Sequence, residues 1–198
     1  DTGIFKPNPM ISKKPFKVMT TASADVPLKG LDFTLRAIAV AKDKYPLINL
    51  VVIGKPRSGG HTERLISKLG IDEFVSFKTN LTNQEVSDEY ASSQIAIVSS
   101  LYEGFGFPVG EAMACAVPLI ATDVASIPEI TGPYAEMITP ESHEDIFNSL
   151  DNIFQSYDHY MKKANLGRDH ILQNFSWSVI ANSYIDHISS ILTSHADI

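Results

Sequence analysis

The fold is indicated by one stretch of the chain, YEGFGFPVGE at residues 102–111, and by the apolar run QIAIV at residues 94–98 before it. The apolar run predicts a strand, and the residues from Pro108 to Ala116 predict a helix, because proline suits the first helical position. Backbone N–H groups at a helix start are unpaired and attract phosphate. Gly104 and Gly106 allow a sharp turn and a close approach to a ligand. The stretch therefore predicts an anion site between a strand and a helix.

Two carboxylates, Glu103 and Glu111, flank this predicted anion site with seven residues between them. We expect Glu103 just before the glycine loop and Glu111 in the first helical turn. Paired carboxylates often divide acid and base roles, which is one interpretation of the pair. A second interpretation is that both accept hydrogen bonds from a ligand that carries phosphates and hydroxyls, as a nucleotide sugar does.

Strand-like and helix-like segments alternate along most of the chain. The predicted strands are 17–22, 49–54, 75–78, 94–99, 118–122 and 135–138, and the predicted helices are 31–44, 62–69, 83–92, 109–116 and 143–155. The strands are apolar with little alternation, which favours a parallel sheet covered on both faces. Right-handed crossovers then predict an α/β, doubly wound, Rossmann-like domain that binds ligands at the carboxyl ends of its strands.

The end of the chain predicts helix alone. After Tyr157 the pattern is wholly helical, and one face of the last segment is apolar. That face is formed by Trp177, Ile180, Tyr184, Ile188 and Ile191. We divide the chain into a linker-like segment (1–14), a Rossmann-like domain (15–172) and a C-terminal helix (173–198).

Composition excludes several classes of protein. The 198 residues are 44% hydrophobic and 20% charged, as in ordinary globular proteins. No apolar run approaches about 20 residues, so no membrane span is expected, and the first residues lack a signal peptide's apolar core. The net charge of -7 argues against nucleic-acid binding. The first residue is not Met, which suggests a fragment of a longer protein.

Cysteine and histidine offer little chemistry. Cys115 is the only cysteine, so a reducing compartment, the cytoplasm, is expected, and its apolar neighbours favour packing over catalysis. The six histidines show no helical metal-ligand pair, so we predict no metal site. His61 follows a glycine pair and is interpreted as a surface residue, with a site role as the alternative.

Two other nucleotide-binding motifs fit poorly. The glycines from Gly104 to Gly110 are spaced one residue too widely for a dinucleotide fingerprint, and they follow the fourth predicted strand rather than the first. A Walker A loop is excluded at Gly54-Lys55, because Pro56 follows the lysine where serine or threonine is needed.

Taken together, these residues resemble a known family. Glu103 and Glu111 resemble the Glu-x7-Glu signature of retaining GT-B glycosyltransferases, the family of sucrose synthases and bacterial mannosyl- and glucosyltransferases. The resemblance also covers EAMACAVP at 111–118, IPEI at 127–130, Lys29-Gly30, FSW at 175–177 and DTGIFKP at 1–7. It spans nearly the whole chain but only one half of such an enzyme, the C-terminal half that binds the nucleotide-sugar donor.

The resemblance implies a role for each matching residue. Glu111 would accept hydrogen bonds from the ribose, Glu103 would hold the transferred sugar, and Lys29 would neutralise the departing diphosphate. Glu103 and Lys29 are thus the predicted catalytic residues. The remaining donor-binding residues are Gly104, Phe105, Gly106, Val109, Gly110, Gly30, Gly54, Lys55, Phe77, Lys78 and Ser23. Among these, Val109 and Gly110 would bind phosphate through their N–H groups, and Phe77 and Lys78 lie where relatives hold the base.

One departure from the family concerns charge. Relatives usually carry an arginine a few residues before the lysine of Lys29-Gly30, and here Ser23 or Ala24 stands in its place. The Ser23 hydroxyl or the nearby Lys55 are candidates to replace the missing cation.

The resemblance implies a hexosyltransferase that retains anomeric configuration, reacts through an oxocarbenium-like transition state and needs no metal or cofactor. UDP-, GDP- or ADP-sugar would be the donor. An acceptor sugar, lipid or other hydroxyl compound would bind an N-terminal domain absent from this chain. The isolated domain should turn over little, and peripheral membrane contact of the full enzyme stays open. The alternatives are a non-catalytic nucleotide-sugar sensor and a GT-B epimerase; a phosphorylase would need a pyridoxal lysine context that is not evident.

Overall fold

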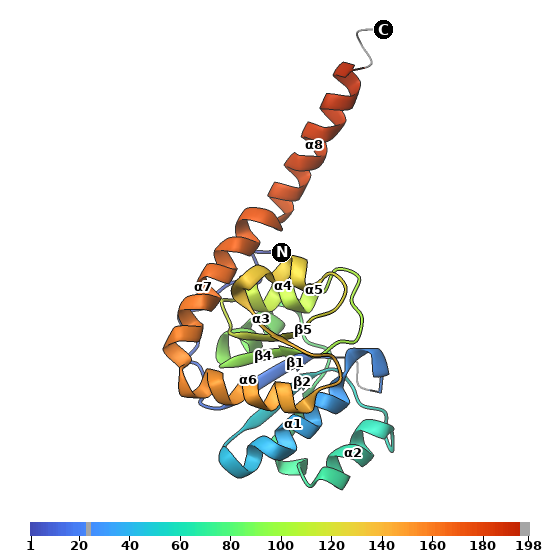
Figure 1. The fold of residues 1–198 in the computed structure, drawn as a ribbon, viewed down its shortest axis with the longest axis vertical. Coiled ribbons are helices and arrows are strands. Elements are labelled where there is room, and N and C mark those ends of the chain that lie inside the picture. The colour runs from blue at the N-terminus through green and yellow to red at the C-terminus, as the bar shows by residue number, and fades with distance from the viewer. Residues whose placement is uncertain (23–24, 195–198) are drawn as a thin grey trace.

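A parallel sheet lies at the centre of the molecule, with strands in the order β3-β2-β1-β4-β5-β6 (Figure 1). The computed structural model describes residues 1–22 and 25–194. The strands are β1 (Lys17–Thr21), β2 (Asn49–Ile53), β3 (Val75–Lys78), β4 (Ile95–Val98), β5 (Leu119–Thr122) and β6 (Glu136–Ile138). Every neighbouring pair is parallel. The predicted doubly wound α/β architecture is confirmed.

Helices connect the strands and continue beyond the last one. They are α1 (Leu31–Lys44), α2 (His61–Leu69), α3 (Asn83–Ser92), α4 (Phe107–Ala114), α5 (Ile127–Thr131), α6 (His143–Gln155), α7 (Tyr157–Asn174) and α8 (Trp177–Ser194). Short 3₁₀ turns are η1 (Pro27–Lys29), η2 (Asp72–Phe74) and η3 (Gly132–Tyr134). Three predicted helices, α1, α3 and α6, have the bounds expected from the sequence. The short α5 and the three 3₁₀ turns were not predicted.

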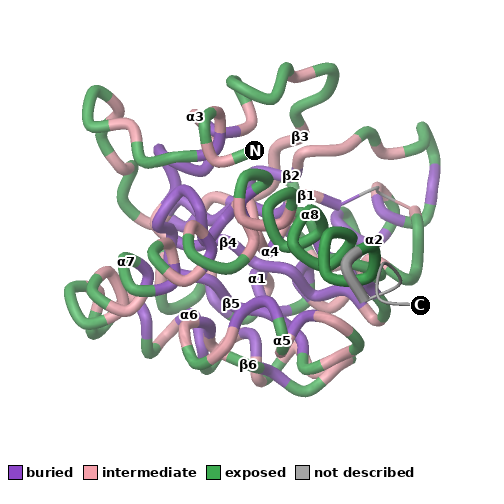
Figure 2. Tube along the Cα trace, turned by 90° about the horizontal axis from the view of Figure 1, so that it is seen from above, coloured by how far each residue is buried: buried purple, intermediate pink, exposed green. Residues whose placement is uncertain are grey.

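The core is divided between the two faces of the sheet. Successive strand residues point to opposite faces, so Val18 packs into one apolar cluster and Met19 into the other. The first cluster joins β1 and β2 to α1, α2 and α6, and the second joins the strands to α3, α4, α5 and α7. The sheet lies between two helical layers (Figure 1) and its central strands are buried (Figure 2), which explains why these strands are nearly continuously apolar.

The linker-like segment 1–14 packs against the domain rather than leading away from it. Phe5 is buried in the second apolar cluster, and Ser87 on α3 donates a hydrogen bond to the Ile4 carbonyl at 2.9 Å. Lys13 donates to the Ser93 carbonyl at 2.8 Å, beyond the end of α3. Burial of the Lys13 ammonium lowers its pKa to about 8.

The last two helices differ in their surroundings. α7 packs closely on α4, and Gly167 lies where an added Cβ would approach Tyr134 and Met113. α8 extends away from the body of the domain (Figure 1) and is exposed from Ala181 to Leu192 (Figure 2), whereas Val179 and Ile180 near its start are half-buried. The predicted helical extension is therefore present. The domain boundary at residue 172 stays a prediction, and it falls within α7, which ends at Asn174.

Candidate functional site

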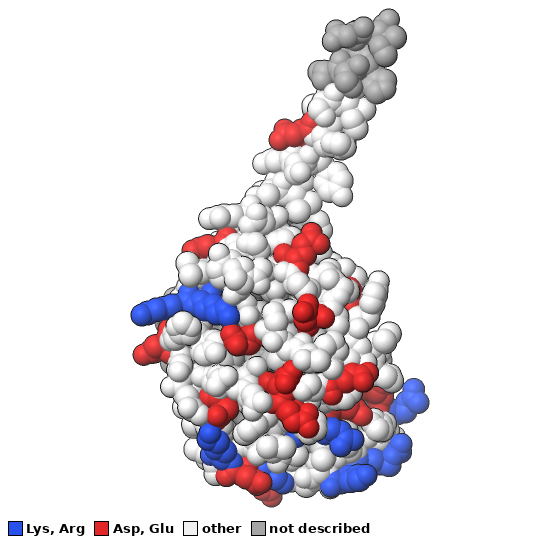
Figure 3. Space-filling view, viewed as in Figure 1, with Lys and Arg blue, Asp and Glu red and all other residues white. Residues whose placement is uncertain are grey.

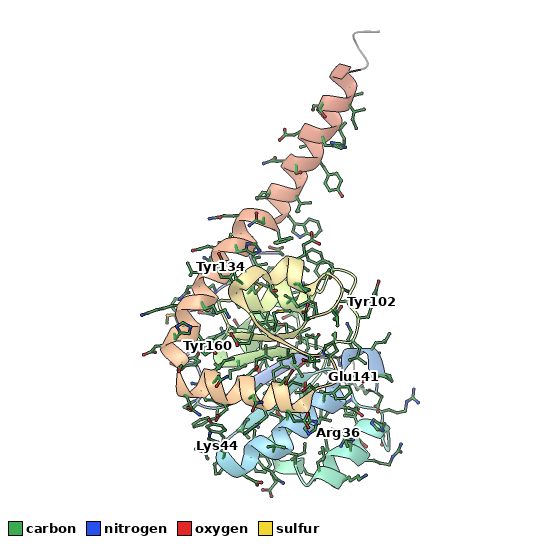
Figure 4. The ribbon with its side chains drawn as sticks, in the orientation of Figure 1. Arg36, Lys44, Tyr102, Tyr134, Glu141 and Tyr160 are labelled. Atoms are coloured by element: carbon green, nitrogen blue, oxygen red, sulfur yellow. The ribbon has the colours of Figure 1, made fainter. Side chains whose placement is uncertain are left out.

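The candidate site lies where the direction of the strand order reverses. β1 and β4 are neighbours, and the sheet continues from β1 toward β3 and from β4 toward β6. Loops after two such strands diverge and leave a crevice, which is where open α/β sheets bind ligands. Lys29 follows β1 and Glu103 follows β4, on the loop marked by Tyr102 in Figure 4. The two predicted catalytic residues therefore come from opposite sides of one switch point.

Hydrogen bonds join these two loops directly. The Leu101 N–H donates to the Leu28 carbonyl at 2.8 Å, and the Ser99 hydroxyl donates to the Gly30 carbonyl at 3.0 Å. Gly30 has a φ of +61°, and a Cβ there would lie 1.9 Å from the Ser99 carbonyl oxygen. Residue 30 must therefore be a glycine for the loops to meet in this way.

Lys29 and Glu103 form an ion pair within this joined unit. The Lys29 Nζ donates to Glu103 Oε1 at 2.7 Å. The Lys29 side chain is 29% exposed and the Glu103 side chain 10% exposed, so the pair is partly screened from solvent but stays reachable. A cation beside a carboxylate at a sheet switch point can bind a phosphate and a hydroxyl of the same ligand.

Hydroxyl groups anchor the loop that carries Glu103. Ser100 donates to Glu103 Oε1 at 2.7 Å, and Thr122 at the end of β5 donates to the Ser100 carbonyl at 2.5 Å. Ser126 donates to the Glu103 carbonyl at 3.3 Å. None of these three was predicted as a site residue. Thr122 ends β5 and the two serines follow β4 and β5, so a hydroxyl residue at or after the end of an apolar strand is the sequence signal that could have found them.

The helix start differs from the prediction in its details. α4 begins at Phe107, so Pro108 is the second helical residue and Glu111 lies in the second turn rather than the first. Gly106 precedes the helix with a φ of 80°, a left-handed conformation that favours glycine. The N–H groups of Val109 and Gly110 donate to the Gly106 carbonyl at 2.9 and 3.3 Å. These two predicted phosphate donors are thus already engaged inside the helix.

Glu111 faces an aromatic pocket beside the glycine loop. A pocket of about 240 Å³ is lined by Glu111 together with Phe105, Phe107, Phe175 and Trp177. Burial raises the pKa of the Glu111 carboxyl above its usual value. Burial also raises the pKa of the nearby Tyr90 hydroxyl, which donates to the Pro108 carbonyl at 3.3 Å. A half-buried carboxylate in such a pocket is poised to accept hydroxyl donors.

The other predicted donor-binding residues are scattered around this centre. Gly54 and Lys55 follow β2, and Lys55 is exposed. Phe77 packs against the first apolar cluster, so it contributes to the core. Lys78 pairs with Glu89 on α3, which also binds the buried Lys17 at 2.7 Å. Ser23 lies outside the described residues.

The structure agrees with the interpretation of Cys115 as a packing residue and of His61 as a surface residue. Cys115 is buried, and burial raises the pKa of its thiol to about 11, so it is a packing residue rather than a nucleophile. The exposed His61 ring lies 2.5 Å from Asp32 on α1. Among residues 1–22 and 25–194, no group of three His, Cys, Asp or Glu side chains is arranged to hold a metal ion.

The fold and the candidate site together define a Rossmann-like domain with a lysine, two glutamates and a glycine-led helix beyond the carboxyl ends of β1 and β4. The chain belongs to the glycosyl transferases group 1 family, whose model matches residues 5–170. This agrees with the resemblance carried by Glu103 and Glu111, and with a C-terminal domain of such an enzyme.

Curated relatives support the family over most of the chain. The MMP α-(1→4)-mannosyltransferase of Mycolicibacterium hassiacum is 33% identical over 91% of this chain and 44% of its own length. A D-inositol 3-phosphate glycosyltransferase of Streptomyces bingchenggensis is 25% identical over 81% of this chain and 37% of its own length. The chain thus spans less than half the length of these relatives.

Solved structures agree with the fold. The C-terminal domain of LpcC, a glycosyl transferase group 1 family protein from Francisella tularensis, has a TM-score of 0.77 and 25% identity, and the match covers 89% of this chain and 98% of that one. The Anabaena HepE protein in complex with UDP has a TM-score of 0.84 at 19% identity, over 96% of this chain and 55% of that one. The domain is therefore one Rossmann-like half of a GT-B fold.

No helix within the described residues has both the length and the apolar character to cross a membrane.

Proposed function

We propose that this domain binds a nucleotide sugar and serves as the donor half of a retaining hexosyltransferase. The observation that carries the proposal is the ion pair between Lys29 and Glu103 at the switch point between β1 and β4. Glu111 follows on the next helix and faces the adjoining pocket. The three side chains suit the three parts of one donor: diphosphate, sugar and ribose.

In the proposed complex, Lys29 lies against the diphosphate, Glu103 holds hydroxyls of the transferred sugar, and Glu111 holds the ribose. Hydrogen bonds from hydroxyls to a carboxylate contribute about 1.5–3 kcal/mol each. During transfer, the bond from the anomeric carbon to the diphosphate oxygen breaks, a bond to the acceptor hydroxyl oxygen forms, and the hydroxyl proton passes to the departing diphosphate. The Lys29 ammonium stabilises the charge that develops on the departing diphosphate.

The relatives guide the choice of ligands. One is a mannosyltransferase and another a glycosyltransferase that uses D-inositol 3-phosphate, and the Anabaena HepE structures contain UDP or UDP-glucose. For this chain we propose a UDP-, GDP- or ADP-hexose as donor. We propose that the acceptor binds a second domain outside this chain, that the exposed face of α8 packs toward that domain, and that the isolated domain turns over little. The single buried cysteine suits a reducing cytoplasm.

Calorimetry of the chain with UDP, GDP, ADP and their hexose derivatives tests donor binding. We expect one base series to bind, and Glu111→Ala to weaken that series by roughly 10-fold or more because the ribose hydroxyls lose a charged acceptor. Exposed Glu73→Ala is the matched control, and it should leave the affinity unchanged. Binding that Glu111→Ala does not weaken would contradict the ribose assignment.

A non-catalytic nucleotide-sugar sensor is the alternative, because it would keep the same pocket. An assay of the full-length protein distinguishes the transferase from the sensor, because only the transferase moves the sugar to an acceptor. Proton NMR of the product gives the anomeric configuration and so tests retention.

A further inference from the structure

The Ser100 hydroxyl lies in a position that the roles assigned above do not explain. Ser100 is 3% exposed and follows β4 by two residues. Its hydroxyl donates to Glu103 Oε1 at 2.7 Å, and the Lys29 ammonium donates to the same oxygen at 2.7 Å. Two donors, one neutral and one charged, thus converge on a single carboxylate oxygen.

The second oxygen of Glu103 is left for a ligand. A carboxylate accepts about four hydrogen bonds over its two oxygens. Within residues 1–22 and 25–194, the hydrogen bonds to the Glu103 carboxylate both go to Oε1. Oε2 therefore keeps its full capacity to accept hydroxyl donors.

Ser100 is itself held by the sheet. Thr122, the last residue of β5, donates to the Ser100 carbonyl at 2.5 Å, and β5 is paired with β4. A buried hydroxyl on a backbone fixed in this way has little freedom to move. The Lys29 ammonium, by contrast, ends a long side chain that is 29% exposed.

We propose that Ser100 is a positioning residue that fixes the Glu103 carboxylate through Oε1 and directs Oε2 to the hydroxyls of the transferred sugar. The inference rests on the proposed donor-binding function and deepens it. When a diphosphate draws on the Lys29 ammonium, Ser100 remains as the fixed donor to Oε1. Ser100 therefore affects binding of the sugar alone. Lys29 affects both parts of the donor, because it contacts the diphosphate and also donates to Glu103.

The test compares nucleoside diphosphates with their sugars, using UDP and UDP-glucose, GDP and GDP-mannose, and ADP and ADP-glucose. We expect Ser100→Ala to reduce the preference for the sugar nucleotide over the diphosphate by roughly 3- to 10-fold in the series that binds, since it removes one hydrogen bond to a charged group. The affinity for the diphosphate alone should not change. Ser100→Thr keeps the hydroxyl and should restore the preference.

Ser93→Ala is the matched control, because Ser93 is another buried serine whose hydroxyl donates to a carbonyl, that of Glu89, away from the site. It should leave both affinities unchanged. An unchanged preference in Ser100→Ala overturns the inference while the proposed function stands. An equal loss of affinity for sugar nucleotide and diphosphate also overturns it, because that is the result of a general structural role.

A second measurement needs no ligand. The side-chain carboxyl ¹³C resonance of Glu103, identified by its loss in Glu103→Gln, should shift in Ser100→Ala and return in Ser100→Thr. A resonance that moves no more in Ser100→Ala than in Ser93→Ala overturns the inference. Failure of the unmodified chain to bind any of the six nucleotides contradicts the proposed function and removes the sugar role of Ser100 with it.

Discussion

At the scale of single residues, the candidate site includes one group whose charged form opposes folding. Glu111 is a half-buried carboxylate whose pKa is raised by burial. Its charged form is therefore less favourable in the folded protein than in the unfolded chain. Functional sites commonly retain such groups at a cost in stability.

We predict that Glu111→Gln stabilises the chain at neutral pH. A carboxyl whose pKa is raised on folding contributes stability below its unfolded pKa, and this contribution is lost as pH rises through the folded pKa. Urea unfolding at pH 7.5 should show a gain on the order of 1 kcal/mol over the unmodified chain, and at pH 4 a smaller one. Exposed Glu73→Gln is the control. A gain in the free energy of unfolding that is equal at the two pH values would contradict a raised pKa for the Glu111 carboxyl.

A second residue-scale prediction concerns Gly30. In Gly30→Ala the new Cβ would lie 1.9 Å from the Ser99 carbonyl oxygen, so the joined loops must separate. We expect a loss of about 3 kcal/mol or more in the free energy of unfolding. Gly59→Ala is a matched control, because Gly59 has a similar φ of +64° but no atom within 4 Å.

The control should lose only about 1 kcal/mol, the cost of a left-handed backbone. Urea unfolding of the two variants measures the difference between them. Equal losses in the free energy of unfolding of Gly30→Ala and Gly59→Ala would mean that the close approach to Ser99 does not affect stability.

At the scale of secondary-structure elements, periodicity predicts long, buried segments better than short connections. The apolar run of β4 and the amphipathic α1 appear where the sequence places them. The short α5 was missed because its five residues cannot display a helical period. The start of α4 was misplaced by one or two residues because Gly106 fixes the helix entry through its left-handed φ, a tertiary feature.

The candidate site likewise has features that the sequence predicts and features that depend on the tertiary structure. The spacing of Glu103 and Glu111 along the chain, and the family resemblance that adds Lys29, predicted a shared site. The ion pair between Lys29 and Glu103 follows from the strand order, which places β1 beside β4. The support from Ser100 and Thr122 depends on how strand ends meet, and no spacing along the chain encodes it.

Two glycines within helices allow an element-scale prediction. Gly110 on α4 has open space around its added Cβ, whereas an added Cβ at Gly167 on α7 would lie 3.0 Å from Tyr134 Cβ. We expect Gly110→Ala to raise the free energy of unfolding by about 0.5–1 kcal/mol through helix propensity. Gly167→Ala should gain less or lose stability because Tyr134 on η3 and Met113 on α4 leave little room for the added Cβ.

Chemical denaturation of the Gly110→Ala and Gly167→Ala variants measures the change in the free energy of unfolding. A larger gain for Gly167→Ala than for Gly110→Ala would contradict this description of the contact.

At the scale of the whole molecule, a well-packed body carries a largely exposed helix. The exposed apolar residues of α8 are Trp177, Tyr184, Ile185, Ile188, Ile191 and Leu192. In Figure 3 this helix is nearly white, with Asp186 as the acidic residue within its bounds and no lysine or arginine there. The core of the domain lies below it, between the sheet and the two helical layers.

We predict that a chain ending at Ser176 keeps its fold. The residues removed contribute little to either apolar cluster, so the free energy of unfolding should fall by about 1 kcal/mol or less. Circular dichroism during urea unfolding should show one cooperative transition, and size-exclusion chromatography should show less self-association than for the longer chain. Loss of cooperative unfolding would mean that α8 is needed by the body of the domain.

Trp177 has a practical consequence as well. It is the only tryptophan in the chain, it is 66% exposed, and it lines the pocket that Glu111 faces. All indole fluorescence of the protein therefore originates at the rim of that pocket. A ligand or a partner segment that fills the pocket should withdraw the indole from water and move its emission to shorter wavelength, so the chain carries its own optical reporter of occupancy.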